Sequence, residues 1–156
     1  MRRNGFTLIE LVVSVAIVAL LASIVIPVEE LLVKRTKEQE LRQSLREIRS
    51  ALDAYKQAVD DKRVDPTLSR SGYPTALAVL VDGVQDRGNV DKQGKLHFLR
   101  RLPRDPFAEN TLSAEESWGK RSYASSADDP REGEDVFDVY SKAAGTGLNG
   151  IPYRKW

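Results

Sequence analysis

Few side chains in this sequence could do chemistry, and the position of Glu10 is the most informative. Glu10 is the only formal charge between Phe6 and Val28, in a run that is otherwise almost wholly apolar. A carboxylate at the depth of a bilayer is costly, so it is kept there where a partner compensates it. An ammonium group at Phe6, four residues earlier, would lie within about one helical turn of Glu10. Glu10 is therefore expected to pair with a positive charge.

The residues before this run indicate how such an ammonium group could arise. Arg2 and Arg3 precede Gly5, and the apolar run begins directly afterwards. A secretory signal has the opposite order, because its cleavage site follows the apolar core. A cut between Gly5 and Phe6 would remove only the leader, residues 1–5. The apolar segment would be kept, and its new amino terminus would be Phe6.

The string GFTLIE, from Gly5 to Glu10, resembles the signal of type IV pilins and pseudopilins. The resemblance implies that a membrane peptidase cuts after Gly5 and that the amine of Phe6 is methylated. It also implies that Glu10 pairs with the Phe6 amine of an adjacent subunit in a filament. Because a buried charge without its partner is strongly unfavourable, the pair would favour one axial register. The alternative is a single-pass anchor that carries an incidental acid.

Hydrophobic patterning predicts one long helix that positions these residues. Residues 6–28 can span a bilayer at about 1.5 Å per residue, and we expect a transmembrane helix that becomes the filament core. Pro27 predicts a kink there, either as a flexible joint or as a proline tolerated at the membrane boundary. Residues 29–61 are expected to continue the helix in amphipathic form. Apolar side chains at helical spacing form a stripe too short for a coiled coil, and should face the chain's own C-terminal domain: Leu41, Leu45, Ile48, Leu52, Tyr55 and Val59.

Residues 62–156 are expected to form a periplasmic C-terminal domain with a short helix, loops and a small antiparallel sheet. Pro74 and Gly83 predict a helix over 74–81, since proline suits a first helical position and glycine the residue after the last. Strands are expected near 120–125 and 135–141, with a weak extended segment at KLHFL and loop before it. The expected fold class is α+β, with the long helix packed on the sheet in a type IV pilin-like fold.

Three motifs in the tail narrow the resemblance. YPTALAVLV, LRRLPRDPF and VFDVYS are similar to segments of the G-type major pseudopilin of type II secretion systems. The resemblance implies a structural subunit that polymerises into a periplasmic filament and helps drive export of folded proteins across the outer membrane. The implied location is the bacterial inner membrane, as a single-pass protein. The implied partners are further copies in a helical filament, minor pseudopilins, the prepilin peptidase and methylase, the inner-membrane assembly platform, and membrane lipid before assembly.

Two other functions stay open at this point. A type IV pilus pilin, used for adhesion, motility or DNA uptake, usually closes its C-terminal loop with a disulfide, which a chain without cysteine cannot form. The other is a membrane-anchored binding domain that never polymerises. Loss of the leader would leave 22 basic against 23 acidic side chains, so no net charge favours binding to nucleic acid.

Enzymatic activity is not expected. His97 is the only histidine and there is no cysteine, which excludes the usual histidine or thiolate metal clusters and a Cys-His dyad. The position of His97 between Leu96 and Phe98 predicts a half-buried strand residue. No catalytic residue is therefore assigned.

The resemblance also raises the question of calcium, which the family's C-terminal loop commonly binds through carboxylates. Ca²⁺ takes six to eight oxygen ligands, usually including several carboxylates. Residues 141–156 contain no acid and include Lys142, so we expect no cofactor and no metal site in this loop. A run of acids lies upstream and is expected to be a solvated loop rather than a different cation site: Asp128, Asp129, Glu132, Glu134 and Asp135.

Overall fold

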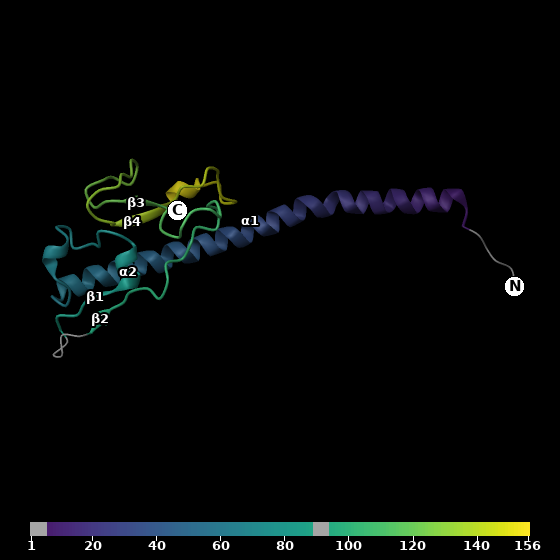
Figure 1. Ribbon diagram of the computed structural model, residues 1–156. Helices are drawn as coiled ribbons and strands as arrows, with labels where there is room; N and C mark the ends of the chain where they lie inside the picture. The colour runs from purple at the N-terminus through teal and green to yellow at the C-terminus, as the bar shows by residue number, and fades with distance from the viewer. Residues whose placement is uncertain (1–5, 89–93) are drawn as a thin grey trace. The chain divides into compact units, whose positions relative to one another are not determined.

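The computed structural model describes residues 6–88 and 94–156, without the side chains of 23–28. The chain divides into two units, Met1–Lys37 and Glu38–Trp156. Helix α1 spans Leu8–Asp60 and contributes to both (Figure 1). The remaining elements belong to the second unit: η1 (Pro66–Leu68), α2 (Ala78–Asp82), β1 (Val84–Gln85), β2 (Lys95–Leu96), β3 (Trp118–Arg121), β4 (Asp138–Ser141) and η2 (Tyr153–Lys155).

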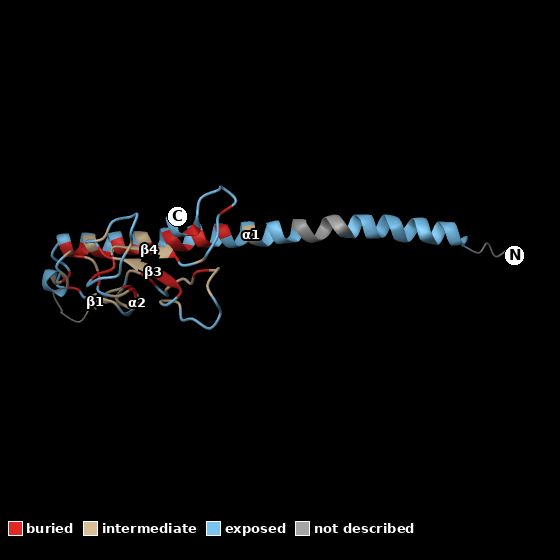
Figure 2. Ribbon diagram, turned by 90° about the horizontal axis from the view of Figure 1, so that it is seen from above, coloured by how far each residue is buried: buried red, intermediate tan, exposed pale blue. Residues whose placement is uncertain are grey.

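The described part of the first unit is the start of α1, and Figure 2 colours its described apolar residues as exposed. Among the residues described, no helical stretch has both the length and the apolar character needed to cross a membrane. Two expectations depend on groups outside the described part of the chain. The first is the cleavage site at Gly5. The second concerns Pro27: α1 is helical through this position, but the proline side chain is not described, and the kink stays a prediction.

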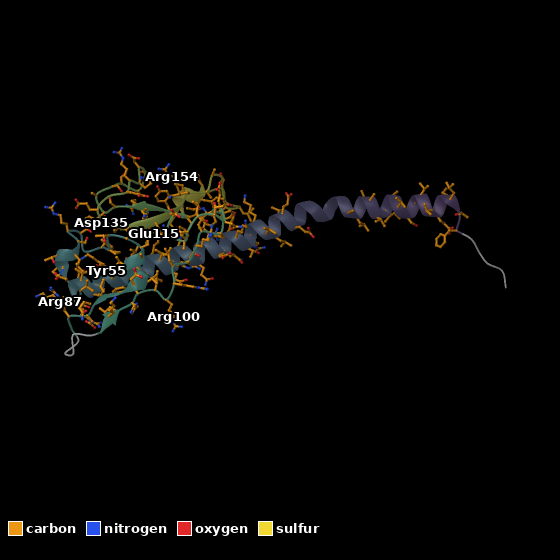
Figure 3. The ribbon with its side chains drawn as sticks, viewed as in Figure 1. Tyr55, Arg87, Arg100, Glu115, Asp135 and Arg154 are labelled. Atoms are coloured by element: carbon orange, nitrogen blue, oxygen red, sulfur yellow. The ribbon has the colours of Figure 1, made fainter. Side chains whose placement is uncertain are left out.

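The second unit is organised around the part of α1 that follows Lys37. All six residues of the predicted stripe are buried, from Leu41 with no exposed surface to Val59 at 8%. Tyr55, which Figure 3 labels, packs its ring against Phe98 at 5.3 Å between centroids. Buried side chains from elsewhere in the unit complete this core: Val64, Leu77, Leu80, Leu99, Trp118, Val136, Val139 and Tyr153.

The strands form two separate antiparallel pairs rather than one sheet. In the first pair, Val84 of β1 lies opposite Leu96 of β2, so β1 occupies a segment predicted to be loop. In the second, Trp118 of β3 lies opposite Ser141 of β4. The α+β, type IV pilin-like fold expected from the sequence is confirmed.

The end of β3 and the start of β4 differ from the predicted bounds for the same reason. Backbone N–H groups near their ends find partners outside the strand pair. Tyr123 donates its N–H to the carboxylate of Asp135 at 2.9 Å, so β3 ends before it. Val136 donates to the carbonyl of Pro74 at 2.8 Å, so β4 begins after it. An amide bonded in this way is not available to a ladder.

The helix predicted over 74–81 begins at Ala78 and ends at Asp82. Gly83 follows the last helical residue, as predicted. It has φ +74° and donates its N–H to the carbonyl of Val79 at 3.1 Å. The prediction for His97 is wrong. His97 is exposed and follows β2, with its Nδ1 2.8 Å from the carbonyl oxygen of Val81.

The LPRDP motif has a structural role that the sequence prediction did not contain. Asp105 is 1% exposed, and its carboxylate accepts hydrogen bonds from the Ser141 hydroxyl at 2.5 Å and the Phe107 N–H at 2.8 Å. The indole of Trp118 donates to the carbonyl of Pro103 at 2.9 Å. The motif therefore ties an extended segment to both strands of the second pair.

Replacing Asp105 with alanine should destabilise the second unit. The hydroxyl of Ser141 and the N–H of Phe107 would each lose an acceptor, at about 1–3 kcal/mol per buried group, so we expect a loss of about 2–6 kcal/mol in the free energy of unfolding. Urea denaturation of the detergent-solubilised chain, followed by tryptophan fluorescence, measures this loss. Asp128→Ala, in an exposed segment, is the control and should change the free energy by less than about 0.5 kcal/mol. Equal stability of the two variants would contradict the assigned role.

Candidate assembly site

Glu10 lies in the first turn of α1 and caps the helix together with Thr7. Thr7 donates both its N–H, at 3.0 Å, and its hydroxyl, at 2.8 Å, to Oε2 of Glu10. The N–H of Glu10 lies 3.3 Å from the Thr7 hydroxyl, which accepts from it. This reciprocal arrangement is a capping box, which satisfies helix N–H groups that have no partner within the helix. The T-x-x-E spacing signals the box in the sequence, but the sequence prediction did not use it.

The capping box leaves part of the Glu10 carboxylate available. All of its side-chain hydrogen bonds within residues 6–88 and 94–156 use Oε2, and none uses Oε1. A carboxylate can accept several bonds in different directions. Glu10 can therefore cap its own helix while offering the other oxygen to a cation. The proposed ammonium group would be on Phe6, the residue directly before Thr7.

The helix that follows Glu10 presents apolar side chains on all sides. The Ser14 hydroxyl donates back to the Glu10 carbonyl at 2.7 Å, so this polar group is satisfied within the helix. Large exposed apolar surfaces mark contacts with a protein or a membrane. Within residues 6–22, the large exposed apolar residues are Phe6, Leu8, Ile9, Leu11, Val12, Val13, Val15, Ile17, Val18, Leu20 and Leu21.

In the second unit, the loop after β4 does not fit a calcium ion. No carboxylate lies within it, and its side-chain oxygens have other partners: the amide oxygen of Asn149 accepts the N–H of Ile151 at 3.0 Å, and the hydroxyl of Ser141 bonds Asp105. Lys142 places its ammonium group 3.1 Å from the carbonyl oxygen of Glu116. This donor set lacks the carboxylates that Ca²⁺ sites usually include.

The upstream acidic run is solvated except at its end. Asp129 pairs with the guanidinium of Arg131 at 2.6 Å. Asp135 differs from the prediction, because it is 9% exposed and bonds the N–H of Tyr123. Within residues 6–88 and 94–156, no three acidic or histidine side chains come together in a group that could hold a metal ion.

Arg49 fixes the end of the chain to α1 and was missed by sequence reasoning. Its guanidinium donates to the carboxylate of Asp138 at 2.8 Å, to the carbonyl of Val139 at 3.2 Å and to that of Trp156 at 2.7 Å. The partners are about a hundred residues away in sequence, so no local pattern indicates them.

Comparisons with known proteins agree with the motifs. Residues 1–26 match the family model described as the prokaryotic N-terminal methylation motif. The type II secretion system core protein G of Klebsiella pneumoniae is 31% identical over 109 residues, which cover 68% of this chain and 70% of the relative. The protein of that name from Dickeya chrysanthemi is 30% identical over 157 residues, covering 96% and 95% respectively. No solved structure matches significantly.

The alignments with core protein G sequences cover between 67% and 96% of this chain. Of the three functions left open by the sequence, they select the secretion pseudopilin. The chain belongs to the family of type II secretion system core protein G, and it is a pseudopilus subunit with a prepilin-type N-terminus.

Proposed function

We propose that the mature chain, beginning at Phe6, is the repeating structural subunit of a periplasmic pseudopilus that helps drive folded proteins across the outer membrane. Prepilin peptidase would cut between Gly5 and Phe6, and the Phe6 amine would be methylated. The observation that carries the proposal is Glu10, a carboxylate in the first turn of α1, where the large apolar side chains described between Phe6 and Leu21 are exposed. The role is structural, with no enzymatic activity.

Before assembly, residues 6–28 would lie in the inner membrane, with the second unit in the periplasm. In the filament, the same side chains would contact neighbouring subunits instead of lipid. Lipid tails are as apolar as leucine, so this exchange supplies little hydrophobic driving force. A contact that forms in the filament but not in the membrane is needed to select the axial register between subunits. Pairing of Glu10 with the Phe6 amine of an adjacent copy supplies it, because charges attract strongly where water is excluded.

The proposed partners follow from this route. Lipid and the prepilin peptidase would contact the subunit before assembly, and the inner-membrane assembly platform would deliver it to the filament. Further copies and minor pseudopilins would contact it there. Neither nucleic acid nor a cofactor is required at any step.

Replacing Glu10 with glutamine should separate capping from charge pairing. The amide oxygen of glutamine still accepts from Thr7, so α1 should begin normally, but the charge is lost. We expect the variant to reach the membrane and be cleaved at wild-type levels, and to yield at least tenfold less sheared filament. Thr7→Ser, which keeps both the hydroxyl and the charge, should assemble as the wild type does. Normal filament yield from Glu10→Gln would refute the charge pair.

Mass spectrometry of the membrane-extracted protein tests the processing step. The mature chain should begin with N-methylated phenylalanine at position 6, since that cut creates the amine that Glu10 needs. Gly5→Leu should leave the full-length precursor in the membrane, because a bulky residue replaces the small one before the cut. A mature chain that begins at any other residue would contradict the assignment.

Deletion of the gene tests the function itself. Export of folded proteins should stop while twitching motility persists, and a plasmid copy of the wild-type chain should restore export. A copy carrying Glu10→Gln should not restore it, whereas Asp128→Asn, in an exposed segment, should. Loss of twitching with intact export would favour a pilus subunit instead.

A further inference from the structure

A carboxylate from α1 closes the loop that follows β4. Glu38 is 4% exposed, and its Oε1 accepts hydrogen bonds from the N–H of Leu148 at 2.8 Å and the hydroxyl of Tyr153 at 2.9 Å. A buried carboxylate is costly unless it is well bonded. Two donors meet this requirement: Leu148 within the loop, and Tyr153, the first residue of η2, directly after it.

Other residues on the same face of α1 hold the end of this segment. The guanidinium of Arg42, one turn after Glu38, lies 4.3 Å from the ring centroid of Trp156. Arg49, two turns further along, donates to the carbonyl of Trp156 at 2.7 Å. Positions separated by four and seven residues share one helix face. The loop and the residues after it are therefore held by a row of charged side chains from one helix.

The phenol of Tyr153 acts as the donor in this arrangement. Burial, together with its hydrogen bond to Glu38 and the charge of that group, raises the pKa of Tyr153 to about 12. The group stays protonated at neutral pH and keeps its bond to Glu38. Its ring stacks on Phe107 at 4.5 Å and meets Trp156 edge-on at 5.2 Å between centroids, so the donor is held in place by packing.

We propose that Glu38 replaces a bound cation as the group that orders residues 142–152, so that the second unit reaches its folded state without calcium. Calcium would order such a loop by gathering carboxylates and carbonyl oxygens around one positive charge. Here the charge is reversed: one negative charge from the helix accepts an N–H of the loop and the O–H of Tyr153, the residue that follows the loop. The proposal concerns the unassembled subunit and does not rest on filament formation.

Thermal unfolding of the mature full-length chain in detergent tests the requirement for calcium. A site filled at a hundred times its dissociation constant would raise the unfolding midpoint by on the order of 10 °C. We expect the midpoint in excess calcium to match that in chelator to within about 1 °C, far below the shift that a filled site produces. A rise of several degrees with calcium, absent with magnesium, would overturn the proposal.

Hydrogen exchange of the segment 142–152 tests the role of Glu38. In the wild type this segment should be protected equally with calcium and with chelator. Glu38→Ala should remove the protection, and added calcium should not restore it. Glu38→Gln should keep most of it, because an amide oxygen still accepts both bonds. Glu40→Ala, at an exposed position on the same helix, is the control and should exchange as the wild type does. Unchanged protection in Glu38→Ala would refute the assignment even if calcium has no effect.

These readouts are independent of assembly. A chain that passes both tests but forms no filament would contradict the proposed function and leave the role of Glu38 standing. A chain that assembles normally but whose unfolding midpoint rises with calcium would contradict the role of Glu38 and leave the proposed function standing.

Discussion

Burial of one face of α1 is the interaction on which the second unit depends. Each of its two sheets has only two strands, and an isolated pair of that size is marginally stable at best in water. The apolar stripe from Leu41 to Val59 supplies the surface against which the strand and loop residues of the core pack. The helix that begins at the proposed assembly site thus also supplies much of the core of the second unit.

Three carboxylates show how this chain uses acids inside its structure. Glu10 binds groups of Thr7 at a helix start, Asp105 binds Ser141 and Phe107, and Glu38 binds Leu148 and Tyr153. In each case at least one donor is a backbone N–H, and in each case a hydroxyl is the second. The buried carboxylates of Asp105 and Glu38 are satisfied by such bonds without a cation, whereas one oxygen of Glu10 is left for the proposed amine partner.

Sequence reasoning predicted what periodicity and local motifs determine. The stripe on α1, the α+β fold and the family all follow from patterns within short windows. The strand bounds did not, because side chains and carbonyls outside the strand pair, such as Asp135 and Pro74, take N–H groups that a strand would use. The contacts of Glu38 and Arg49 join residues far apart in sequence, which no window contains. Only the capping box of Thr7 had a local signal that was available and unused.

The hydrogen bond between Glu38 and Leu148 joins positions 110 residues apart, so it cannot form until most of the chain has been synthesised. Translation makes α1 before the C-terminal segment. Glu38, Arg42 and Arg49 therefore emerge from the ribosome well before the residues that they bind. Contacts of such long range slow folding, because the connecting chain must be ordered first. During that interval the apolar stripe lacks its cover and is prone to aggregate. A nascent subunit of this kind therefore needs protection until its last residues have been made.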